Sequence, residues 1–575
     1  MNNRFFLALV LTAIVIVVTP LLFPSTTKRP APVLVDTTAH RVDSVQPATQ
    51  AKSVPPEAPI LQPAPSVGST PATTAAVPET STVRSSLTTY QFSSGGAVPT
   101  SIVLNAFPSH RSGPGDQGCR TGRGAPAKCV ELVGPGRALV SYRLALARDT
   151  ISLDTIVFRG EQSTAPAQGV RYAADIAGHA TRITYAVSSD TAASYLVKAT
   201  VSVADAPPGS SLIVRLPQTL LANEADTVDD INHLAVSFRP ARGEVTSVAF
   251  SKLDSVEARS EAGPINWIAT RNKYFLVALR AEHTPFSAVR LLGSPRVGKL
   301  TTGMRGAASM PLGSDGTASF DLYSGPQDFE RLQHLGGDLD QVNPYAGFLH
   351  GVVQPFANVV MKALLWMKRT THLNYGWVLV LFGVLIRLIL WPLNQGAMRT
   401  SMKMQRLQPE LQALQKKHKD DPKKQQEAVM KVYKDHGMSP LSPLMGCLPM
   451  LLPMPVLYAL YYVFQNTIEF RGVSFLWLAD ISLRDPFYIT PLLMGISMFV
   501  MSWIGMRNSP PNPQAKMMSY MMPVMLTVLF LNFASGLNLY YAVQNLAAIP
   551  QQWLLARERG KQAPVPSASL SKRRT

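Results

Sequence analysis

The strongest constraint on the fold of this 575-residue chain is a set of six apolar stretches that are almost free of charge. Each is about 17 to 21 residues long, which matches the helix length that crosses the hydrocarbon layer of a membrane. Arg387 is the one formal charge inside them. The pattern predicts a polytopic α-helical membrane protein with six transmembrane helices, at residues 5–23, 373–393, 444–464, 487–505, 517–533 and 537–555.

Basic residues gather in the short segments between these stretches. The net charge of +18 would suit a nucleic-acid-binding protein, but residues 394–438 alone hold ten basic and five acidic residues. The tail 556–575 holds six basic residues and one acidic residue, whereas the far longer region 24–372 holds 32 basic and 27 acidic residues. Positive charge on alternate short loops marks the cytoplasmic side of a membrane. We therefore expect both termini in the cytoplasm and residues 24–372 on the outer side of the membrane.

Residues 1–23 are interpreted as an N-terminal membrane anchor. The apolar run is long for a signal peptide, and no small-x-small cleavage pattern follows it. A cleaved signal peptide is the alternative.

The exported region divides into a linker and a β domain. Residues 24–86 are rich in Pro, Ala, Thr and Ser and lack periodicity, as in an extended linker. Residues 87–343 carry short runs of alternating apolar residues separated by turn residues. This pattern predicts a large antiparallel β-sandwich.

Two cysteines lie close together in the exported region. Cys119 and Cys129 would form a disulfide in an oxidising compartment, although two free thiols are equally consistent with their spacing. No histidine stands near them at the spacing of a metal site, so neither a metal nor a cofactor is expected.

Two further helical segments are predicted beside the membrane. Residues 344–372 contain an apolar stripe at helical spacing, which favours an amphipathic interfacial helix over a last core helix of the β domain. Residues 394–438 contain two short stripes around Asp420-Asp421-Pro422, as in a cytoplasmic helical hairpin with Asp421 capping its second helix. The stripe in residues 344–372 consists of Phe356, Val359, Val360, Ala363, Leu364 and Met367. The first hairpin stripe consists of Met404, Leu407, Leu411 and Leu414, and the second consists of Ala428, Val429, Val432 and Tyr433.

Arg387 is the sharpest functional candidate. It lies about 14 residues, or roughly 21 Å, along its predicted span. An arginine near the middle of a membrane costs roughly 2.5–3.5 kcal/mol on insertion scales, and it cannot lose its proton. The other predicted spans contain no Asp or Glu, so a water-filled cavity open to the cytoplasm is the favoured explanation. Snorkelling of the side chain to the cytoplasmic surface is the alternative.

The last span is unusually polar. Polar groups are unfavourable against lipid and suit a wall that faces water or the protein interior. We therefore expect this span to line the same cavity as Arg387, through Asn538, Tyr540, Tyr541, Gln544 and Asn545.

Several motifs stand out in the membrane region. They are Leu385-Ile-Arg387, Trp391-Pro392-Leu393, Ser442-Pro443-Leu444, Gly446-Cys447-Leu448-Pro449, Met454-Pro455 and Ser535-Gly536-Leu537 with Tyr540-Tyr541. These motifs resemble the YidC membrane-protein insertase family, in its bacterial inner-membrane form with a large periplasmic domain and both termini in the cytoplasm. They cover most of residues 345–556 in the order of the family. Two positions depart from the family pattern: Gly383 replaces a frequent hydroxyl residue, and Pro453 replaces a polar one.

The resemblance implies a membrane-protein insertase and chaperone rather than an enzyme. It implies a core of five spans at 373–556 with a hydrophilic groove, in which Arg387 is the positive charge, and a basic cytoplasmic tail at 557–575. It also implies that the exported domain is a supersandwich similar to sugar mutarotases. The implied partners are nascent membrane proteins, the Sec translocon, ribosomes or targeting factors, and the phospholipid bilayer.

Two other function classes compete with this interpretation. A transporter would need more than one isolated arginine and usually shows paired repeats with broken helices. A membrane-anchored carbohydrate-active or sugar-binding protein would need convergent histidines and carboxylates in the β domain. His233 and His283 lie there without a local motif.

Overall fold

The computed structural model describes residues 77–561, and all of them belong to one compact unit. The predicted anchor, nearly all of the linker, Cys447 and the tail beyond residue 561 lie outside the described residues. The undescribed gaps are residues 112–118, 120–127, 147–148, 162–168, 188–194, 254–257, 295, 298–299, 302, 344–349, most of 393–420, 436–453 and 508–512.

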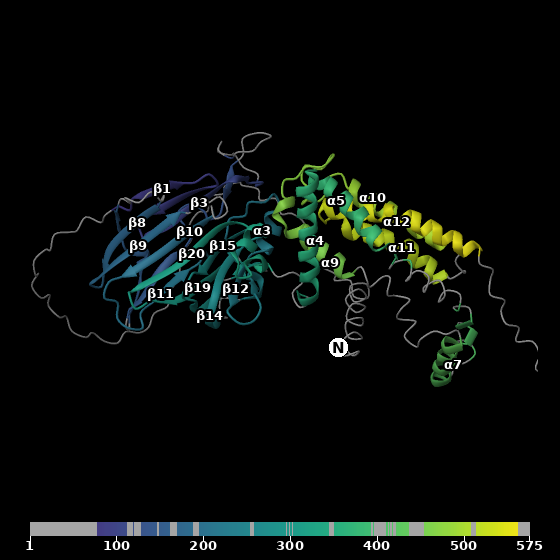
Figure 1. The fold of residues 1–575 in the computed structure, drawn as a ribbon, viewed down its shortest axis with the longest axis horizontal. Coiled ribbons are helices and arrows are strands. Elements are labelled where there is room, and N and C mark those ends of the chain that lie inside the picture. The colour runs from purple at the N-terminus through teal and green to yellow at the C-terminus, as the bar shows by residue number, and fades with distance from the viewer. Residues whose placement is uncertain are drawn as a thin grey trace, which may run out of the picture. The chain divides into compact units, whose positions relative to one another are not determined.

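The exported region forms a β domain with two main sheets (Figure 1). The smaller sheet has four strands, in the order β1-β2-β3-β4. The larger sheet has 14 strands, and its main path runs β6-β5-β11-β19-β16-β14-β15-β20-β10-β9-β8-β7. Off this path, β12 pairs with β14, and β13 pairs with β12. Every strand pairing between described residues is antiparallel.

The strands divide between the two sheets in chain order. The smaller sheet contains β1 Thr80–Arg84, β2 Thr88–Ser93, β3 Val98–Pro108 and β4 Cys129–Glu131. The larger sheet contains β5 Ser141–Leu146, β6 Asp149–Ser152, β7 Arg159–Glu161, β8 Gly169–Ile176, β9 His179–Val187, β10 Leu196–Val203, β11 Ser211–Arg215, β12 Ala235–Pro240, β13 Thr246–Ala249, β14 Ala258–Arg271, β15 Phe275–Ala281, β16 Phe286–Gly293, β19 Met304–Pro311 and β20 Thr317–Pro326. The pair β17 Arg296–Val297 and β18 Leu300–Thr301 stands apart.

Alternation in the sequence is what builds this domain. In β10 and β11, every second side chain is buried, because successive side chains of a strand point to opposite faces. Both main sheets contribute to a single apolar core, in which Tyr90 and Phe92 of β2 and Tyr185 of β9 are fully buried. A large β domain was therefore predictable, whereas its description as a supersandwich stays an expectation.

The predicted end of the linker needs correction. Strand β1 pairs along its whole length with β2, so the β domain starts by residue 80 rather than after residue 86. The strand is hard to recognise because Val83 is its only buried residue. An edge strand of this kind needs little apolar surface, and its composition resembles that of the linker.

The helical part of the chain follows the β domain. Helix α2 Thr227–Asn232 and helix α3 Phe329–Leu335 belong to loops of the β domain. Among the described residues, the helices with full bounds beyond residue 349 are α4 His350–Thr371, α5 Tyr375–Ile389, α7 Pro422–Asp435, α9 Met454–Asn466, α10 Ile489–Met506, α11 Pro513–Phe530 and α12 Ser535–Lys561. Helix α12 packs against α10 and α5, and α4 packs against α9.

Helix length alone supports few of the predicted membrane spans. Among the described residues, α10 is long and apolar enough to cross a membrane by itself. Helices α4 and α5 pass the same test as a pair bent by 118°, and Ser519–Phe530 in α11 is a shorter apolar helix. A helical membrane domain is consistent with this, and the number of six spans stays a prediction.

Helix α4 confirms the predicted helix but shifts its buried face. Val360, Leu364 and Met367 are buried in the core of the helical region, not in the core of the β domain. Phe356 and Val359 were expected on the same face, yet they are 43% and 67% exposed. The apolar residues cover more than one side of the helix, so spacing alone could not tell which side packs against α9.

The predicted hairpin is supported by the residues that are described there. Leu407 and Leu411 form a small apolar core with Val432, and Leu414 and Val429 pack against it. The Asp421 carboxylate accepts a hydrogen bond from the backbone N–H of Lys424 at 3.2 Å, as expected for the residue that caps α7.

Residues 467–488, which we call the α9–α10 loop, connect α9 to α10 and contact the starts of α5 and α12. Backbone N–H groups of Ser535 and Gly536 at the start of α12 donate to carbonyls of the loop at 2.7 and 2.9 Å. The Asn374 side chain, which caps α5, donates to the carbonyl of Ser474 at 3.0 Å. Gly376 leaves room for the ring of Phe475, which would collide with any side chain at that position.

Asp485 fastens this loop to α10. Its buried carboxylate accepts hydrogen bonds from the backbone N–H groups of Thr490 at 2.7 Å and Phe487 at 3.0 Å and from the Trp477 indole at 3.2 Å. Asp485→Ala would leave these donors without an acceptor, so we expect it to lower stability by about 2–3 kcal/mol. The measurement is the thermal unfolding temperature of purified protein, compared with the exposed control Asp435→Ala. Equal unfolding temperatures for the two variants would contradict this role.

Candidate functional site

Arg387 lies in the last turn of α5 and contacts α12. Its Nη2 donates a hydrogen bond to Gln551 Oε1 at 2.7 Å. Gln551 Nε2 in turn donates to the carbonyl of Trp391 at 3.2 Å, just beyond the end of α5. Gln551 is 2% exposed, and Arg387 Nε is buried without a hydrogen-bond partner among the described residues. The guanidinium is therefore only partly satisfied by the protein, as expected of a group that also meets water or a ligand.

Gln551 was missed by the sequence analysis, although a signal for it existed. It stands seven residues, or about two helical turns, after Gln544 and therefore on the same face of α12. The predicted set of polar residues ended at Asn545. An arginine in a membrane span needs a partner, and a glutamine on the packed face of another span is a suitable one.

Tyr540 and Gln544 share this face of α12. Gln544 Nε2 donates to the Tyr540 hydroxyl at 2.6 Å, and the Tyr540 ring lies 5.9 Å from that of Phe382 on α5. Residues 540, 544 and 551 differ by no more than about 40° around the helix. The structure thus brings Tyr540 and Gln544 to the side of α12 that carries the partner of Arg387.

The other three predicted residues lie on other faces of α12. Asn538 Nδ2 donates to the carbonyl of Phe530 in α11 at 3.1 Å, and the Tyr541 ring packs edge-on against Phe530 at 5.6 Å. Asn545 Nδ2 donates to Ser497 Oγ in α10 at 3.2 Å. These side chains join helices in this structure, and their role in a groove stays a prediction.

The structure also explains Gly383, one of the two departures from the family pattern. A Cβ at this position would lie 3.2 Å from Val543 Cγ1 and 3.5 Å from the Tyr540 ring. Glycine here lets α5 and α12 approach closely, which brings the face carrying Gln551 within reach of Arg387. The loss of a hydroxyl is thus accompanied by tighter helix packing.

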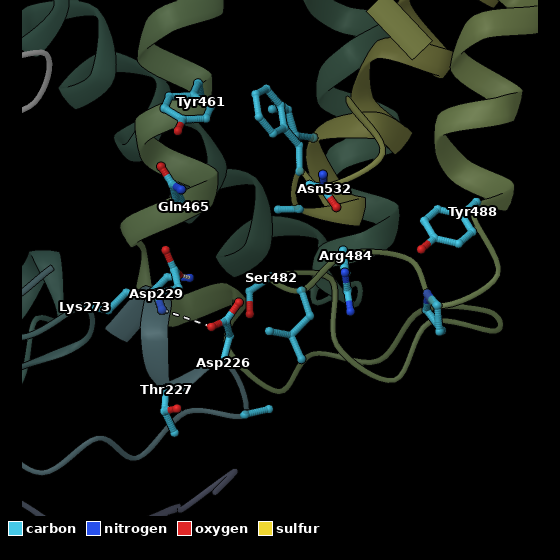
Figure 2. Close-up of a pocket in the computed structure, with 16 residues that line it drawn as sticks. Asp226, Thr227, Asp229, Lys273, Tyr461, Gln465, Ser482, Arg484, Tyr488 and Asn532 are labelled. Atoms are coloured by element: carbon cyan, nitrogen blue, oxygen red, sulfur yellow. Dashed lines mark hydrogen bonds and ion pairs between the residues drawn. The ribbon is translucent and has the colours of Figure 1, made fainter. Parts of the chain in front are cut away.

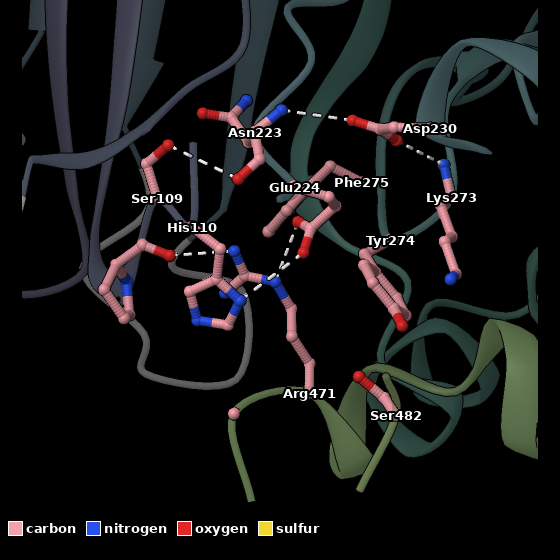
Figure 3. A network of polar contacts seen from close by, with 12 residues as sticks. Ser109, His110, Asn223, Glu224, Asp230, Lys273, Tyr274, Phe275, Arg471 and Ser482 are labelled. Carbon is pink, nitrogen blue, oxygen red and sulfur yellow. Dashed lines mark hydrogen bonds and ion pairs between the residues drawn. The ribbon is translucent and has the colours of Figure 1, made fainter. Parts of the chain in front are cut away.

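A second polar cluster joins the β domain to the α9–α10 loop (Figure 3). Arg471 Nε donates to Glu224 Oε1 at 2.9 Å, and Arg471 Nη2 donates to the carbonyl of Pro108 at 2.8 Å. The side chains of Arg471 and Glu224 are only 3% and 6% exposed. The guanidinium also lies over the rings of Tyr274 and Phe275, at 6.0 and 5.5 Å. We call Arg471, Glu224, His110 and Asp480 the junction cluster.

His110 and Asp480 complete the junction cluster. His110 Nδ1 lies 3.6 Å from Glu224 Oε2 and 3.8 Å from Asp480 Oδ2. Burial lowers the pKa of His110 to about 4, with a further decrease from the positive Arg471, so the imidazole is neutral at pH 7. Burial also raises the pKa of Glu224, while Arg471 acts in the opposite direction. Arg471 is therefore the positive charge of this cluster at neutral pH, and it is paired with Glu224.

A cavity of about 640 Å³ also lies between the β domain and the helical region. Figure 2 shows Asp226, Asp229 and Lys273 of the β domain on one side and Gln465 and Tyr461 of α9 above them. Lys273 is paired with Asp229 at 2.8 Å. Arg484, Tyr488 and Asn532 from the helical region complete the polar lining.

Glu469 is a buried carboxyl in the α9–α10 loop. Its Oε1 accepts the backbone N–H of Phe329 at 3.4 Å, and its Oε2 is buried without a partner among the described residues. Burial and the nearby Asp328 raise the pKa of Glu469 to about 8. The folded protein therefore holds a proton that the unfolded chain releases above its ordinary pKa of 4.5.

This proton makes stability depend on pH in a known direction. Because the folded-state pKa is raised, the contribution of Glu469 should fall as pH rises from about 4.5 to about 8. Glu469→Gln is neutral at every pH and should remove this slope. The unfolding temperature of the variant minus that of the wild type should therefore increase from pH 5 to pH 8. The exposed control Glu427→Gln should show no such gain. Parallel pH profiles for wild type and Glu469→Gln would rule out a protonated Glu469.

The predicted cysteine pair is present as two free thiols. Cys119 Sγ and Cys129 Sγ both lie near the carbonyl oxygen of Asn105, at 3.6 and 3.9 Å. Their disulfide stays a prediction. Within the part of the chain that is described, no group of His, Cys, Asp and Glu side chains could hold a metal ion.

Two family models match the chain. Residues 128–359 match the model described as YidC periplasmic domain, and residues 366–562 match the model described as 60Kd inner membrane protein. The first covers most of the β domain together with the start of α4, and the second covers the rest of the described helical region. The order agrees with the order that the motifs predicted.

Similar proteins carry the corresponding name. A membrane protein insertase YidC of Chlorobium phaeovibrioides is 32% identical over 361 residues, which cover 60% of this chain and 61% of that protein. One of Chlorobaculum tepidum is 29% identical over 515 residues, which cover 85% of this chain and 83% of that protein. The chain thus matches about three fifths of the first relative's length and a larger share of the second.

Solved structures are more distant. An active YidC insertase is 19% identical over 83% of this chain and 95% of that chain, with a TM-score of 0.32. A galactose mutarotase related enzyme from Lactobacillus acidophilus is 10% identical over 43% of this chain and 97% of that chain, with a TM-score of 0.28. Scores of this size support no structural argument.

The motifs around Arg387, the two successive family models and the long alignments agree with one another. They describe an inner membrane protein with a β-sheet periplasmic domain followed by a helical membrane domain. The chain therefore belongs to the YidC membrane protein insertase family with a periplasmic domain.

Proposed function

We propose that this protein inserts integral membrane proteins and helps them fold, with Arg387 as the positive charge of a hydrophilic groove. The observation that carries the proposal is a guanidinium on α5 that the protein satisfies only in part, through Gln551. Family membership supports the activity. In this role the protein acts on nascent membrane proteins without catalysing a chemical reaction.

The physical task is to carry a short polar segment across the hydrocarbon layer. Polar backbone and charged groups are very unfavourable in hydrocarbon because water is absent. A groove that holds water partway through the bilayer shortens the distance over which this penalty applies. Arg387 attracts acidic residues of the incoming segment, and no nucleotide is needed for that step.

The proposed topology has six spans with both termini in the cytoplasm. The charge distribution supports it, because the hairpin at 394–438 and the tail at 557–575 are strongly basic. The hairpin and the tail would meet ribosomes, targeting factors or nascent chains. The protein would work alone or beside the Sec translocon, and the exposed apolar residues of α4, such as Phe356 and Trp366, would face the bilayer.

The alternative functions gain no support from the described residues. A carbohydrate-active site needs histidines and carboxylates that converge on a substrate. His233 Nδ1 is instead hydrogen-bonded to the carbonyl of Asp229 within α2, and His283 is exposed at the surface beside Glu282. A transporter would need further ionisable groups near Arg387, whose hydrogen-bond partner among the described residues is the neutral Gln551.

The role of Arg387 can be tested by separating charge from geometry. Lysine keeps the positive charge but lacks the planar fork of arginine. Arg387→Lys should retain most activity, whereas Arg387→Ala should insert a substrate with an acidic translocated segment about tenfold more slowly, equivalent to about 1.4 kcal/mol. The measurement is the insertion rate of one model substrate, with and without an acidic residue in that segment, at equal protein abundance. Arg507→Ala, a change at an exposed arginine on another helix end, serves as the control.

Two results would contradict this mechanism. Full activity of Arg387→Ala on the acidic substrate would show that the charge only snorkels to the surface. Complete failure of Arg387→Lys would show that the fork geometry, and with it the contact to Gln551, matters more than the charge.

The proposed topology has its own test. Reporter domains that are active only in the cytoplasm, fused within residues 394–438 and at the C-terminus, should both be active. A reporter fused within the β domain should be active only outside the cytoplasm. An outside signal from the hairpin would refute the topology.

A further inference from the structure

We propose that the periplasmic domain holds the α9–α10 loop closed over the outer ends of the membrane helices and thereby seals the protein against ion leakage. The proposal rests on the proposed function, because a seal is needed only where a polar groove enters the membrane. It assigns the domain a task separate from insertion.

The α9–α10 loop covers the ends of the membrane helices. It connects the end of α9 to the start of α10, and its backbone carbonyls receive the N–H groups of Ser535 and Gly536 at the start of α12. Asn374, the capping residue of α5, donates to the carbonyl of Ser474, and Phe475 fills the space above Gly376. One loop thus contacts the same ends of α5, α9, α10 and α12.

Asp480 gives the loop its shape. Its Oδ1 accepts the backbone N–H of Ser482 at 2.8 Å and the Ser482 hydroxyl at 2.7 Å, and its Oδ2 accepts the N–H of Gly472 at 2.9 Å. Asp480 is also the loop residue that His110 of the β domain approaches at 3.8 Å. The β domain therefore contacts the carboxylate that fixes the shape of the α9–α10 loop.

Arg471 anchors the α9–α10 loop to the β domain. It extends from the loop into the β domain, where it is enclosed by Glu224, the carbonyl of Pro108 and the rings of Tyr274 and Phe275. A buried charge pair is strongly destabilised when one partner is lost, because the other charge remains buried and unpaired. The loop is therefore stable in its closed position only while Glu224 is in place.

The junction cluster lies far from Arg387. Arg387 is 12 residues after the start of α5, or roughly 18 Å along the helix from the end that the loop covers. Weakening the junction cluster should loosen the cover without altering the contact between Arg387 and Gln551. Ion leakage should therefore change while insertion continues.

The test uses the full-length protein in sealed liposomes loaded with a pH-sensitive dye. Glu224→Gln and Arg471→Gln should each raise the proton leak about threefold or more over wild type, with the insertion rate of the model substrate unchanged within about twofold. Arg484→Gln is the matched control, because Arg484 lies in the same loop but is exposed and has no ion pair among the described residues. The exchanged pair Glu224→Arg with Arg471→Glu should leak less than either single variant.

Three outcomes would overturn the seal. They are an unchanged leak in both single variants, an equal leak from Arg484→Gln, and an exchanged pair that leaks more than the single variants. Loss of insertion by Arg387→Ala is a separate result, so the seal and the proposed function can fail independently.

A measurement on the wild-type protein keeps the proposal testable if the variants fold poorly. The N–H groups of Gly472, Ile481 and Ser482 are bonded within the loop. Their hydrogen exchange should be slow in the full-length protein and should quicken in a chain carrying Glu224→Gln. Fast exchange of these amides in the wild type would show that the loop is not held closed.

Discussion

A charged guanidinium inside an apolar helix bundle is the constraint on which the membrane domain depends. Arg387 can be kept there only if water or protein groups compensate its charge. In the structure, Gln551 supplies one hydrogen bond and also binds the carbonyl of Trp391 at the end of α5. This contact joins α5 to α12, and Gly383 permits the close approach of the two helices. The contact of Arg387 and the packing of α5 against α12 therefore depend on the same few residues.

The two ends of the bundle are built on different principles. Near the end of α5, one arginine has a neutral partner and a buried Nε without a partner among the described residues. At the opposite end, Arg471 meets Glu224, two aromatic rings and a backbone carbonyl. An incompletely satisfied cation suits a site that receives water and passing segments, whereas a fully enclosed cation suits a fixed contact. This difference supports a groove that opens to the cytoplasm and is closed on the periplasmic side.

Local patterns predicted the elements but not the contacts between them. Alternation along residues 196–203 and helical spacing along 407–432 identified a strand and a hairpin because each pattern depends on neighbouring residues. Gln551 and Arg387 are 164 residues apart, and Arg471 and Glu224 are 247 residues apart, so no local rule could pair them. The faces of α4 were misassigned at Phe356 and Val359 for the same reason, since apolar residues surround much of that helix.

The central claim is that water reaches the face of α12 beside Arg387 from the cytoplasm and not from the periplasm. The most direct measurement is the labelling of Gln544→Cys, in a chain whose own three cysteines are replaced, by a thiol reagent that cannot cross membranes. Thiols react fast only where water and the reagent can reach them. The account predicts rapid labelling when the reagent is on the cytoplasmic side of sealed vesicles and little labelling from the periplasmic side. Labelling from the periplasmic side, or none from either side, would contradict it.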